Sequence, residues 1–234
     1  MSQGRHDEIA NGLAAVRERI ERACSDAGRP ATDITLIVVT KFFPPSDVRL
    51  LADLGVRHVG ENRHQEAVEK AAECADLGLD WHFIGALQSN KAAAVAGYAD
   101  AVHSVDRAKL LGGLSRGAQE RDREIDCLVQ VSLDPPDASG RSGADVEQVP
   151  ALAEKILETD GLRLRGVMGV APLGGDARAA FARLADQASV VRRLEPEATW
   201  ISAGMSIDLE EAIQEGATHL RIGSAVLGPR PVVK

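Results

Sequence analysis

Phenylalanine, tryptophan and tyrosine together make up only 3% of the 234 residues of this sequence. A core with so few rings must be built from valine, leucine, isoleucine and alanine, and the hydrophobic fraction of 44% is ordinary for a globular protein. Cysteine is also rare, with three residues far apart in the sequence, Cys24, Cys74 and Cys127. This number and spacing argue against a disulfide framework or a zinc site and indicate a reducing compartment.

Positive charge is in the minority, because 27 lysines and arginines face 35 acidic residues, which gives a net charge of -8. Such an acidic chain is poorly suited to non-specific binding to DNA or to anionic membranes. The polar N-terminus, MSQGRHDE, lacks the apolar core of a signal peptide, and no apolar run is long enough to span a bilayer. We therefore expect a cytoplasmic protein with neither a nucleic-acid nor a membrane partner.

Short apolar runs alternate with longer helical patterns along the chain, after a first helix expected over residues 8–24. The expected strands span 34–41, 56–60, 81–85, 101–105, 127–133, 164–170, 199–203 and 219–223. The expected helices between them span 45–54, 62–76, 88–97, 106–121, 144–158, 175–193 and 206–214.

This alternation predicts an α/β fold with a parallel sheet and crossover connections. Eight strands in a chain of this length favour a single, TIM-like (β/α)8 barrel with an extra N-terminal helix, and an open doubly wound sheet is the alternative. No boundary in composition divides the chain, so we expect one domain over residues 1–234. The stretch DPPDASGRSG at 134–143 predicts turns and mobility.

The first expected strand runs through ITLIVVT and ends in Lys41, at the end of a barrel where active sites lie. If the barrel closes, the first strand lies beside the eighth, and Lys41 becomes a neighbour of Arg221. A lysine in a dry pocket beside another cation gives up its proton more readily, and its neutral amine can form a Schiff base with a carbonyl. The alternative is an ordinary strand-end lysine that extends its ammonium into solvent.

Two short stretches, GMS at 204–206 and GS at 223–224, stand where an expected strand hands over to a helix. Glycine allows close approach of a ligand, and N–H groups at a helix start favour an anion. Barrels often build a phosphate site from the loops after strands 7 and 8. The alternative is that Ser206 is only the N-cap of the following helix. A phosphate site near Lys41 and Arg221 would suit a phosphorylated aldehyde, such as pyridoxal 5'-phosphate (PLP) or a sugar phosphate.

Four stretches carry a resemblance to a known family: VVTK at 38–41, GENRHQE at 60–66, WHFIGALQSNK at 81–91 and GMSIDLEEAIQEGATHLRIGSAVLG at 204–228. In these motifs the chain resembles the PLP homeostasis protein family, which is similar to the N-terminal barrel of bacterial alanine racemases. The resemblance runs from the first helix to the C-terminus and implies a PLP-binding barrel without a second domain. It departs from the usual pattern at Phe42-Phe43-Pro44-Pro45, at Ala203 and at MGVAP (168–172), all at the expected rim of the site.

The resemblance implies which residues bind the cofactor, matched motif by motif. These are Lys41, Asn62, Met205, Ser206, Arg221, Gly223 and Ser224. Lys41 matches the lysine that forms the internal aldimine. Ser206, Gly223 and Ser224 match the residues that hold the phosphate, and Arg221 matches the arginine that faces the pyridine nitrogen. Met205 and Asn62 match positions that line the cofactor.

A cationic Arg221 beside the pyridine nitrogen would disfavour its protonation and weaken the ring as an electron sink. Alanine racemases also use a tyrosine from a second domain, whereas the single tyrosine here, Tyr98, lies in an expected helical stretch. We therefore expect a non-catalytic protein, monomer or weak dimer, that buffers PLP or delivers it to PLP-dependent apo-enzymes. The alternatives are a PLP-dependent enzyme such as a small amino-acid racemase, a Schiff-base aldolase acting on sugar phosphates, and an interaction protein on an inherited scaffold.

Histidines on the expected third and fourth strands, His82 and His103, are interpreted as hydrogen-bonded core residues. A metal site that joins them to Glu61 lacks the HxH or HExxH spacing. Lys91 and Arg141 are interpreted as solvated surface charges, with a second anionic ligand as the alternative.

Overall fold

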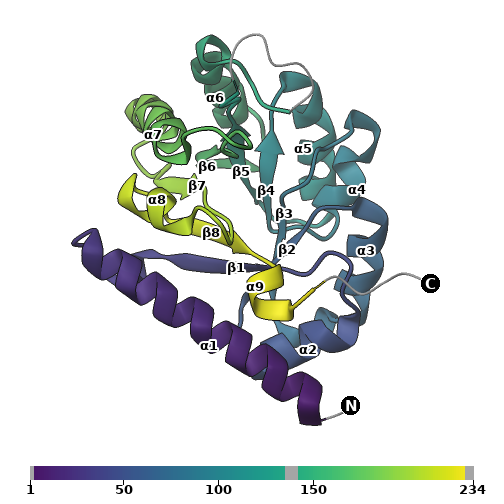
Figure 1. Ribbon diagram of the computed structural model, residues 1–234. Helices are drawn as coiled ribbons and strands as arrows, with labels where there is room; N and C mark the ends of the chain where they lie inside the picture. Colours follow the sequence, from purple (N-terminus) through teal and green to yellow (C-terminus); the bar gives the residue numbers. More distant parts are fainter. Residues whose placement is uncertain (1–2, 135–141, 230–234) are drawn as a thin grey trace.

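The computed structural model of the protein describes residues 3–134 and 142–229. Within this part of the chain, eight parallel strands pair in sequence order, and β1 pairs with β8 to close a barrel (Figure 1). The strands are β1 (Thr35–Val39), β2 (His58–Glu61), β3 (Asp80–Phe83), β4 (Ala101–Val105), β5 (Ile125–Gln130), β6 (Leu162–Met168), β7 (Trp200–Ser202) and β8 (His219–Ile222). The predicted (β/α)8 barrel is confirmed, and the open doubly wound sheet is wrong.

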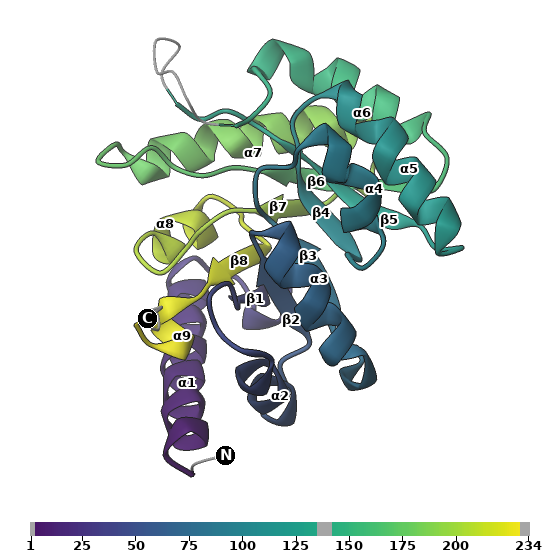
Figure 2. The same ribbon diagram turned by 90° about the vertical axis from the view of Figure 1, so that its right-hand side faces the viewer.

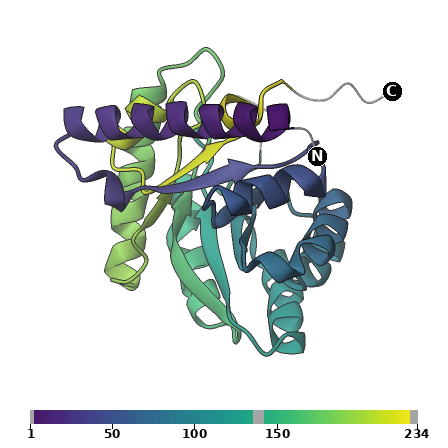
Figure 3. The same cartoon turned by 90° about the horizontal axis from the view of Figure 1, so that it is seen from below.

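Helices surround the sheet on the outside, as two perpendicular views show (Figure 1, Figure 2). The α-helices are α1 (Gln3–Asp26), α2 (Pro45–Asp53), α3 (His64–Glu73), α4 (Ala92–Ala96), α5 (Leu111–Glu120), α6 (Val149–Leu157), α7 (Ala177–Leu194), α8 (Leu209–Gln214) and α9 (Ser224–Leu227). The 3-10 helices are η1 (Ala31–Asp33), η2 (Ala75–Leu77), η3 (Ser89–Lys91), η4 (Ala108–Leu110) and η5 (Val146–Gln148). Helix α1 packs against α8 and α9 and runs beside β1 (Figure 3), so it covers the seam where the barrel closes.

The core follows from the shortage of aromatic residues. Apart from Phe83 and Met168, the largest fully buried side chains are leucines and isoleucines. Strands in a closed parallel sheet are buried on both faces, which is why their sequences read as continuous apolar runs and do not alternate. The interior of the barrel is an exception, because it also holds buried histidines and an arginine, which are described below.

The predicted boundaries of the strand and the helix next to the pocket are wrong. Strand β1 ends at Val39 and not at Lys41, because Phe42 has a left-handed backbone with φ of 72° that turns the chain. The helix expected from residue 206 begins at Leu209, and the short helix α9 had no counterpart among the expected elements. Four residues are too few to show a helical period.

The three cysteines are buried and free. No helix within residues 3–134 or 142–229 is long and apolar enough to cross a membrane. Arg141, for which a second anionic ligand was one interpretation, lies outside the described residues, as does most of the stretch 134–143.

Candidate functional site

The carboxyl ends of β1, β7 and β8 meet around one pocket of about 270 Å³. It is lined by Val39, Lys41, Phe42, Phe43, Ile84, Met205, Ser206, Ile207, Arg221, Gly223 and Ser224. Six of the seven residues implied to bind the cofactor therefore lie around a single pocket. The seventh, Asn62, is exposed and lines a neighbouring pocket of about 530 Å³.

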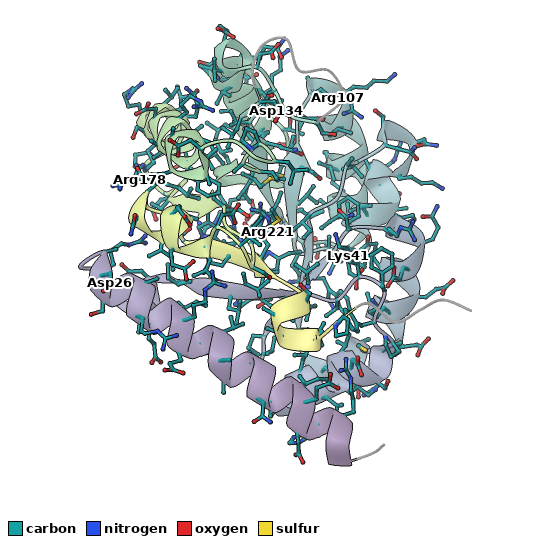
Figure 4. All side chains as sticks on the ribbon, viewed as in Figure 1. Asp26, Lys41, Arg107, Asp134, Arg178 and Arg221 are labelled. Carbon is teal, nitrogen blue, oxygen red and sulfur yellow. The ribbon has the colours of Figure 1, made fainter. Side chains whose placement is uncertain are left out.

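Closure of the barrel explains how residues so far apart in sequence come together. Strand β1 pairs with β8 so that Ile37 lies opposite Arg221 and Val38 opposite Ile222. Lys41 follows two residues after the end of β1, at the same end of the sheet. Figure 4 labels Lys41 and Arg221, and both lie in the centre of the molecule, within the ring of helices.

The backbone on both sides of Lys41 is held by helix α3. The carbonyl of Thr40 accepts from Lys70 Nζ at 2.8 Å and from the Phe43 N–H at 3.0 Å. The Phe42 N–H donates to the Glu66 carboxylate. A left-handed conformation is unfavourable for a phenylalanine, so these contacts stabilise a turn that would not form by itself.

A buried ion pair lies directly behind this turn. Lys70 Nζ is 2.6 Å from Glu61 Oε1, with side chains 3% and 1% exposed, and Thr40 Oγ1 donates to the same oxygen at 2.6 Å. Burial raises the pKa of the Glu61 carboxyl, an effect that the Lys70 ammonium opposes. Lys70 and Glu66 were not among the predicted site residues, although their i, i+4 spacing on α3 was a visible signal.

Arg221 forms part of the pocket wall from within the barrel. Its Nη1 donates to Ser202 Oγ at 2.7 Å and its Nη2 to the Gly169 carbonyl at 2.9 Å, so both acceptors are neutral. Burial lowers the pKa of Arg221 to about 10, and the charge of Asp208 opposes part of this lowering. The guanidinium therefore stays charged at neutral pH.

The GMS stretch forms a tight loop between β7 and α8. Gly204 has φ of +89°, and a Cβ there would lie 2.7 Å from Ala212 Cβ. The Met205 N–H donates to Asp208 Oδ1 at 2.7 Å, and Asp208 is the residue before α8. The interpretation of Ser206 as the helix N-cap is therefore wrong, and Ser206 lines the pocket instead.

The GS stretch forms the adjoining wall. Gly223 is the residue before α9, and a Cβ on it would lie 3.1 Å from the Val39 carbonyl oxygen. A side chain there would press on the end of β1, next to Lys41. The absence of a side chain thus lets the β8 and β1 ends approach closely, with Ser224 at the pocket edge.

The chemistry of the lining fits an anionic ligand with an electrophilic group. Among the described residues around the pocket are an amine, a guanidinium and two hydroxyls, and none of them is acidic. Cations, hydroxyls and backbone N–H groups are the usual donors to a phosphate. The donor set therefore fits a phosphorylated aldehyde such as PLP.

The two histidines expected in the core are buried, and His82 Nδ1 lies 2.9 Å from His103 Nε2, which confirms the interpretation as hydrogen-bonded core residues. Glu61 is engaged by Lys70 and Thr40 instead. The described part of the chain contains no cluster of His, Cys, Asp and Glu that could hold a metal ion. Lys91 lines the larger neighbouring pocket.

Comparison with known proteins identifies the class first. Residues 12–231 match the sequence model of the family described as alanine racemase, N-terminal domain. A PLP homeostasis protein of Mycobacterium tuberculosis is 41% identical, over 97% of this chain and 94% of its own length. The protein of the same name from Escherichia coli K12 is 35% identical, over 97% and 99%. The chain therefore belongs to the PLP homeostasis protein family, within the class of alanine racemase N-terminal domains.

A solved structure agrees with this assignment. PipY of Synechococcus elongatus, determined with PLP bound, is 36% identical and superposes with a TM-score of 0.81, over 94% of this chain and all of that one. The fold and the family implied by the four sequence motifs are thus confirmed.

Proposed function

We propose that this protein binds PLP on Lys41 and takes part in PLP homeostasis by buffering the cofactor or delivering it. The observation that carries the proposal is the convergence of Lys41, Arg221 and the two serine loops on one pocket, whose described lining residues include no acidic side chain. Sequence similarity to the PLP homeostasis proteins and to the PLP-bound PipY supports this proposal.

Each residue has a separate task in the proposed complex. The Lys41 amine condenses with an aldehyde, so that a C=N bond forms and one water leaves. Ser206, Gly223 and Ser224 hold the phosphate, and Arg221 keeps a positive charge facing the pyridine nitrogen. Met205 lines the cofactor from the GMS loop, and Asn62 approaches from the neighbouring pocket. PLP itself supplies the reactive aldehyde and an electron-accepting ring.

We also propose that the protein acts without catalytic turnover. Arg221 donates to two neutral acceptors and stays charged, which disfavours a protonated pyridine beside it. Tyr98 is stacked on His64, its hydroxyl oxygen is buried, and burial raises the pKa of that hydroxyl. Tyr98 is not among the residues around the Lys41 pocket, so it cannot act there as the second acid or base of a racemase.

The partners and the location follow from this role. We propose that PLP-dependent apo-enzymes receive the cofactor and that the protein works in the cytoplasm as a monomer or weak dimer. The buried, free cysteines support a reducing environment.

The experiment is borohydride reduction after addition of PLP, followed by peptide mapping of the modified lysine. We expect an absorption band of bound PLP and a reduced adduct on Lys41, and we expect both to disappear in Lys41→Ala. Lys91→Ala, which changes a lysine of the neighbouring pocket, is the matched control and should retain both. An adduct that persists in Lys41→Ala would refute the proposal.

The non-catalytic part has its own measurement. The loaded protein is incubated with L-alanine, and the product is analysed by chiral chromatography. Racemisation at the rate of an ordinary enzyme would show that the protein is a catalyst, whereas transfer of PLP to an apo-enzyme without racemisation supports the carrier role.

A further inference from the structure

A continuous row of hydrogen bonds crosses the interior of the barrel and ends on Arg221. His58 Nδ1 lies 3.1 Å from His82 Nε2, and His82 Nδ1 lies 2.9 Å from His103 Nε2. His103 Nδ1 lies 2.8 Å from Ser202 Oγ, which accepts from Arg221 Nη1 at 2.7 Å. We call His58, His82, His103 and Ser202 the histidine column.

The column connects the two ends of the barrel. His58 is the first residue of β2, at the amino-terminal end, and its side chain is 36% exposed. His82, His103 and Ser202 lie on β3, β4 and β7 and are buried. Arg221, at the far end of the row, lines the Lys41 pocket. No part of the PLP site described above uses the three histidines.

Burial favours the neutral form of the buried histidines of the column. Burial lowers the pKa of His82 and of His103 well below the ordinary value, and neighbouring histidines contribute to both shifts. The Arg221 charge further lowers the pKa of His103. A neutral imidazole has one N–H donor and one acceptor nitrogen. Each ring that bonds on both sides must therefore accept from one neighbour and donate to the other, so the direction of all the bonds is linked.

Arg221 favours one direction from the pocket end, whereas Asp80 Oδ2, which is 3.5 Å from His58 Nδ1, favours a hydrogen on that nitrogen at the other end. The Arg221 guanidinium donates to Ser202 Oγ, and the Ser202 hydroxyl can then donate to His103 Nδ1. With that direction, His103 donates from Nε2 to His82 Nδ1. His82 in turn donates from Nε2 to His58 Nδ1. Every dipole of the column then points its negative end at the cation, and bonds aligned in this way strengthen one another.

The opposite direction is unfavourable at the serine. His103 and Arg221 would both donate to the one oxygen of Ser202, and the serine hydrogen would need a different acceptor. The acceptor strength that Ser202 offers to Arg221 therefore depends on which nitrogen of His103 carries the hydrogen. This dependence extends to His82 by the same argument.

We propose that Ser202, His103 and His82 are positioning residues for Arg221, and that their hydrogen-bond direction fixes the guanidinium that faces the cofactor. The inference rests on the proposed function only in that Arg221 is taken to lie beside the pyridine ring of PLP. It assigns a role to the polar side chains inside the barrel, because apolar side chains in their place could not hydrogen-bond Arg221.

The direction of the column can be measured in the protein without PLP. Long-range ¹H–¹⁵N NMR of ¹⁵N-histidine-labelled protein reports which ring nitrogen carries the hydrogen. We expect His82 and His103 each to be neutral, with the hydrogen on Nε2. A hydrogen on Nδ1, a mixture of tautomers or a protonated ring at neutral pH, at either residue, would overturn the inference.

The effect on the cofactor site is tested with substitutions. Ser202→Ala removes the acceptor of Arg221, and we expect the PLP dissociation constant to rise roughly fivefold, as for one lost hydrogen bond. The absorption band of bound PLP should shift, because the charge beside the ring moves. Ser202→Thr keeps the hydroxyl and should restore both values. Failure of the threonine variant to restore either one contradicts a positioning role.

His82→Phe interrupts the column at a ring that does not touch Arg221, and it should change the PLP band and the affinity in the same direction as Ser202→Ala. His219→Phe is the matched control, because His219 is equally buried and packs against the rings of His82 and His103, but its hydrogen bond goes to Thr218 and not to the column. We expect His219→Phe to leave the band in place even if it lowers stability. Equal effects of the two variants would overturn the inference.

The result separates this inference from the proposed function. If the wild-type protein forms the reducible Lys41 adduct while Ser202→Ala and His82→Phe leave the band and the affinity unchanged, only the inference fails. If the wild-type protein forms no adduct, the proposed function fails, and the NMR measurement alone decides the direction of the column.

Discussion

At the scale of single residues, the site is supported by charges that do not line it. The ion pair of Lys70 and Glu61 is almost fully buried, and both residues also bond Thr40, next to Lys41. Removal of one partner from such a pair leaves an unpaired charge in the interior. The free-energy cost of that buried charge is larger than the net stabilisation that the intact pair provides.

Lys70→Met should therefore lower the free energy of unfolding by about 3–5 kcal/mol, measured by urea denaturation at neutral pH. Lys91→Met, at a half-buried position in the neighbouring pocket, is the control and should change it by about 0.5 kcal/mol or less. Equal losses in the two variants would contradict the assigned role of the pair.

The pH dependence of this loss has a definite sign. Burial raises the pKa of Glu61 in the folded protein, so folding takes up a proton between the unfolded value of about 4.3 and the raised folded value. Without the Lys70 ammonium the folded pKa rises further. The destabilisation of Lys70→Met should therefore shrink as the pH falls through that window, as urea unfolding at several pH values would show. A loss independent of pH would mean that Glu61 does not carry the effect.

The sequence was informative about residues in motifs and uninformative about contacts between elements. Lys41, Ser206 and Arg221 could be selected because each stands at a strand end. The partners Lys70 and Ser202 could not, because their orientation depends on how α3 and β7 pack against the rest of the barrel. The same limit applies to the histidine column, whose members come from four different strands.

At the scale of elements, the loop between β7 and α8 depends on a glycine for two reasons. Gly204 combines a left-handed backbone with a space that a Cβ would overlap, 2.7 Å from Ala212 Cβ and 2.8 Å from Leu220 Cδ2. Gly216 has a similar φ of +93°, but the nearest atom to a Cβ there, on Ile201, is 3.9 Å away. The two positions separate backbone strain from steric overlap.

Gly216→Ala should cost about 1 kcal/mol of stability, the usual penalty of a left-handed alanine. Gly204→Ala should cost about 1–3 kcal/mol more, because overpacking adds to the strain, and it should weaken PLP binding as the loop shifts. Thermal denaturation and PLP titration check both variants. Equal costs at the two positions would show that the overlap is relieved elsewhere.

Helix α1 reaches the same loop from outside. Arg19 Nη1 donates to the Ser206 carbonyl at 2.6 Å, and the same guanidinium is paired with Glu210 on α8. Arg19→Ala should raise the PLP dissociation constant a few-fold, because an anchor of the loop is lost, an effect of the size of one hydrogen bond. Arg22→Ala, which removes an exposed pair with Glu18 and no hydrogen bond to the loop, should leave it unchanged. Fluorescence titration with PLP distinguishes the two.

The type and order of the elements could be predicted, and their ends could not. Strands and helices were expected in the right sequence because apolar runs and helical periods are local signals. The end of β1 and the start of α8 depend on the Glu66 and Asp208 carboxylates, each of which takes a backbone N–H and so decides where the turn lies. A period in the sequence does not report such bonds.

At the scale of the whole molecule, the site and the fold are tied together by closure of the barrel. The pairing of β1 with β8 brings Lys41 and Arg221 to one pocket, and α1 covers the seam. A ligand that binds only this closed state stabilises it in proportion to the logarithm of its concentration.

We therefore expect PLP to raise the free energy of unfolding by about 2.7 kcal/mol at a free concentration 100 times its dissociation constant. Lys41→Ala should show little of this gain under the same PLP concentration, because its affinity is reduced. Differential scanning calorimetry with and without PLP measures the shift. A gain of equal size in the variant would place the binding elsewhere in the protein.

The order of the pocket residues along the polypeptide has a consequence for biosynthesis. Lys41, the proposed attachment point, is translated well before the groups proposed to hold the phosphate, which stand after residue 203. A nascent chain on the ribosome therefore contains the lysine long before the chain can bind the phosphate of the cofactor. With the proposed binding mode, PLP can be held at this pocket only after translation has passed Ser224.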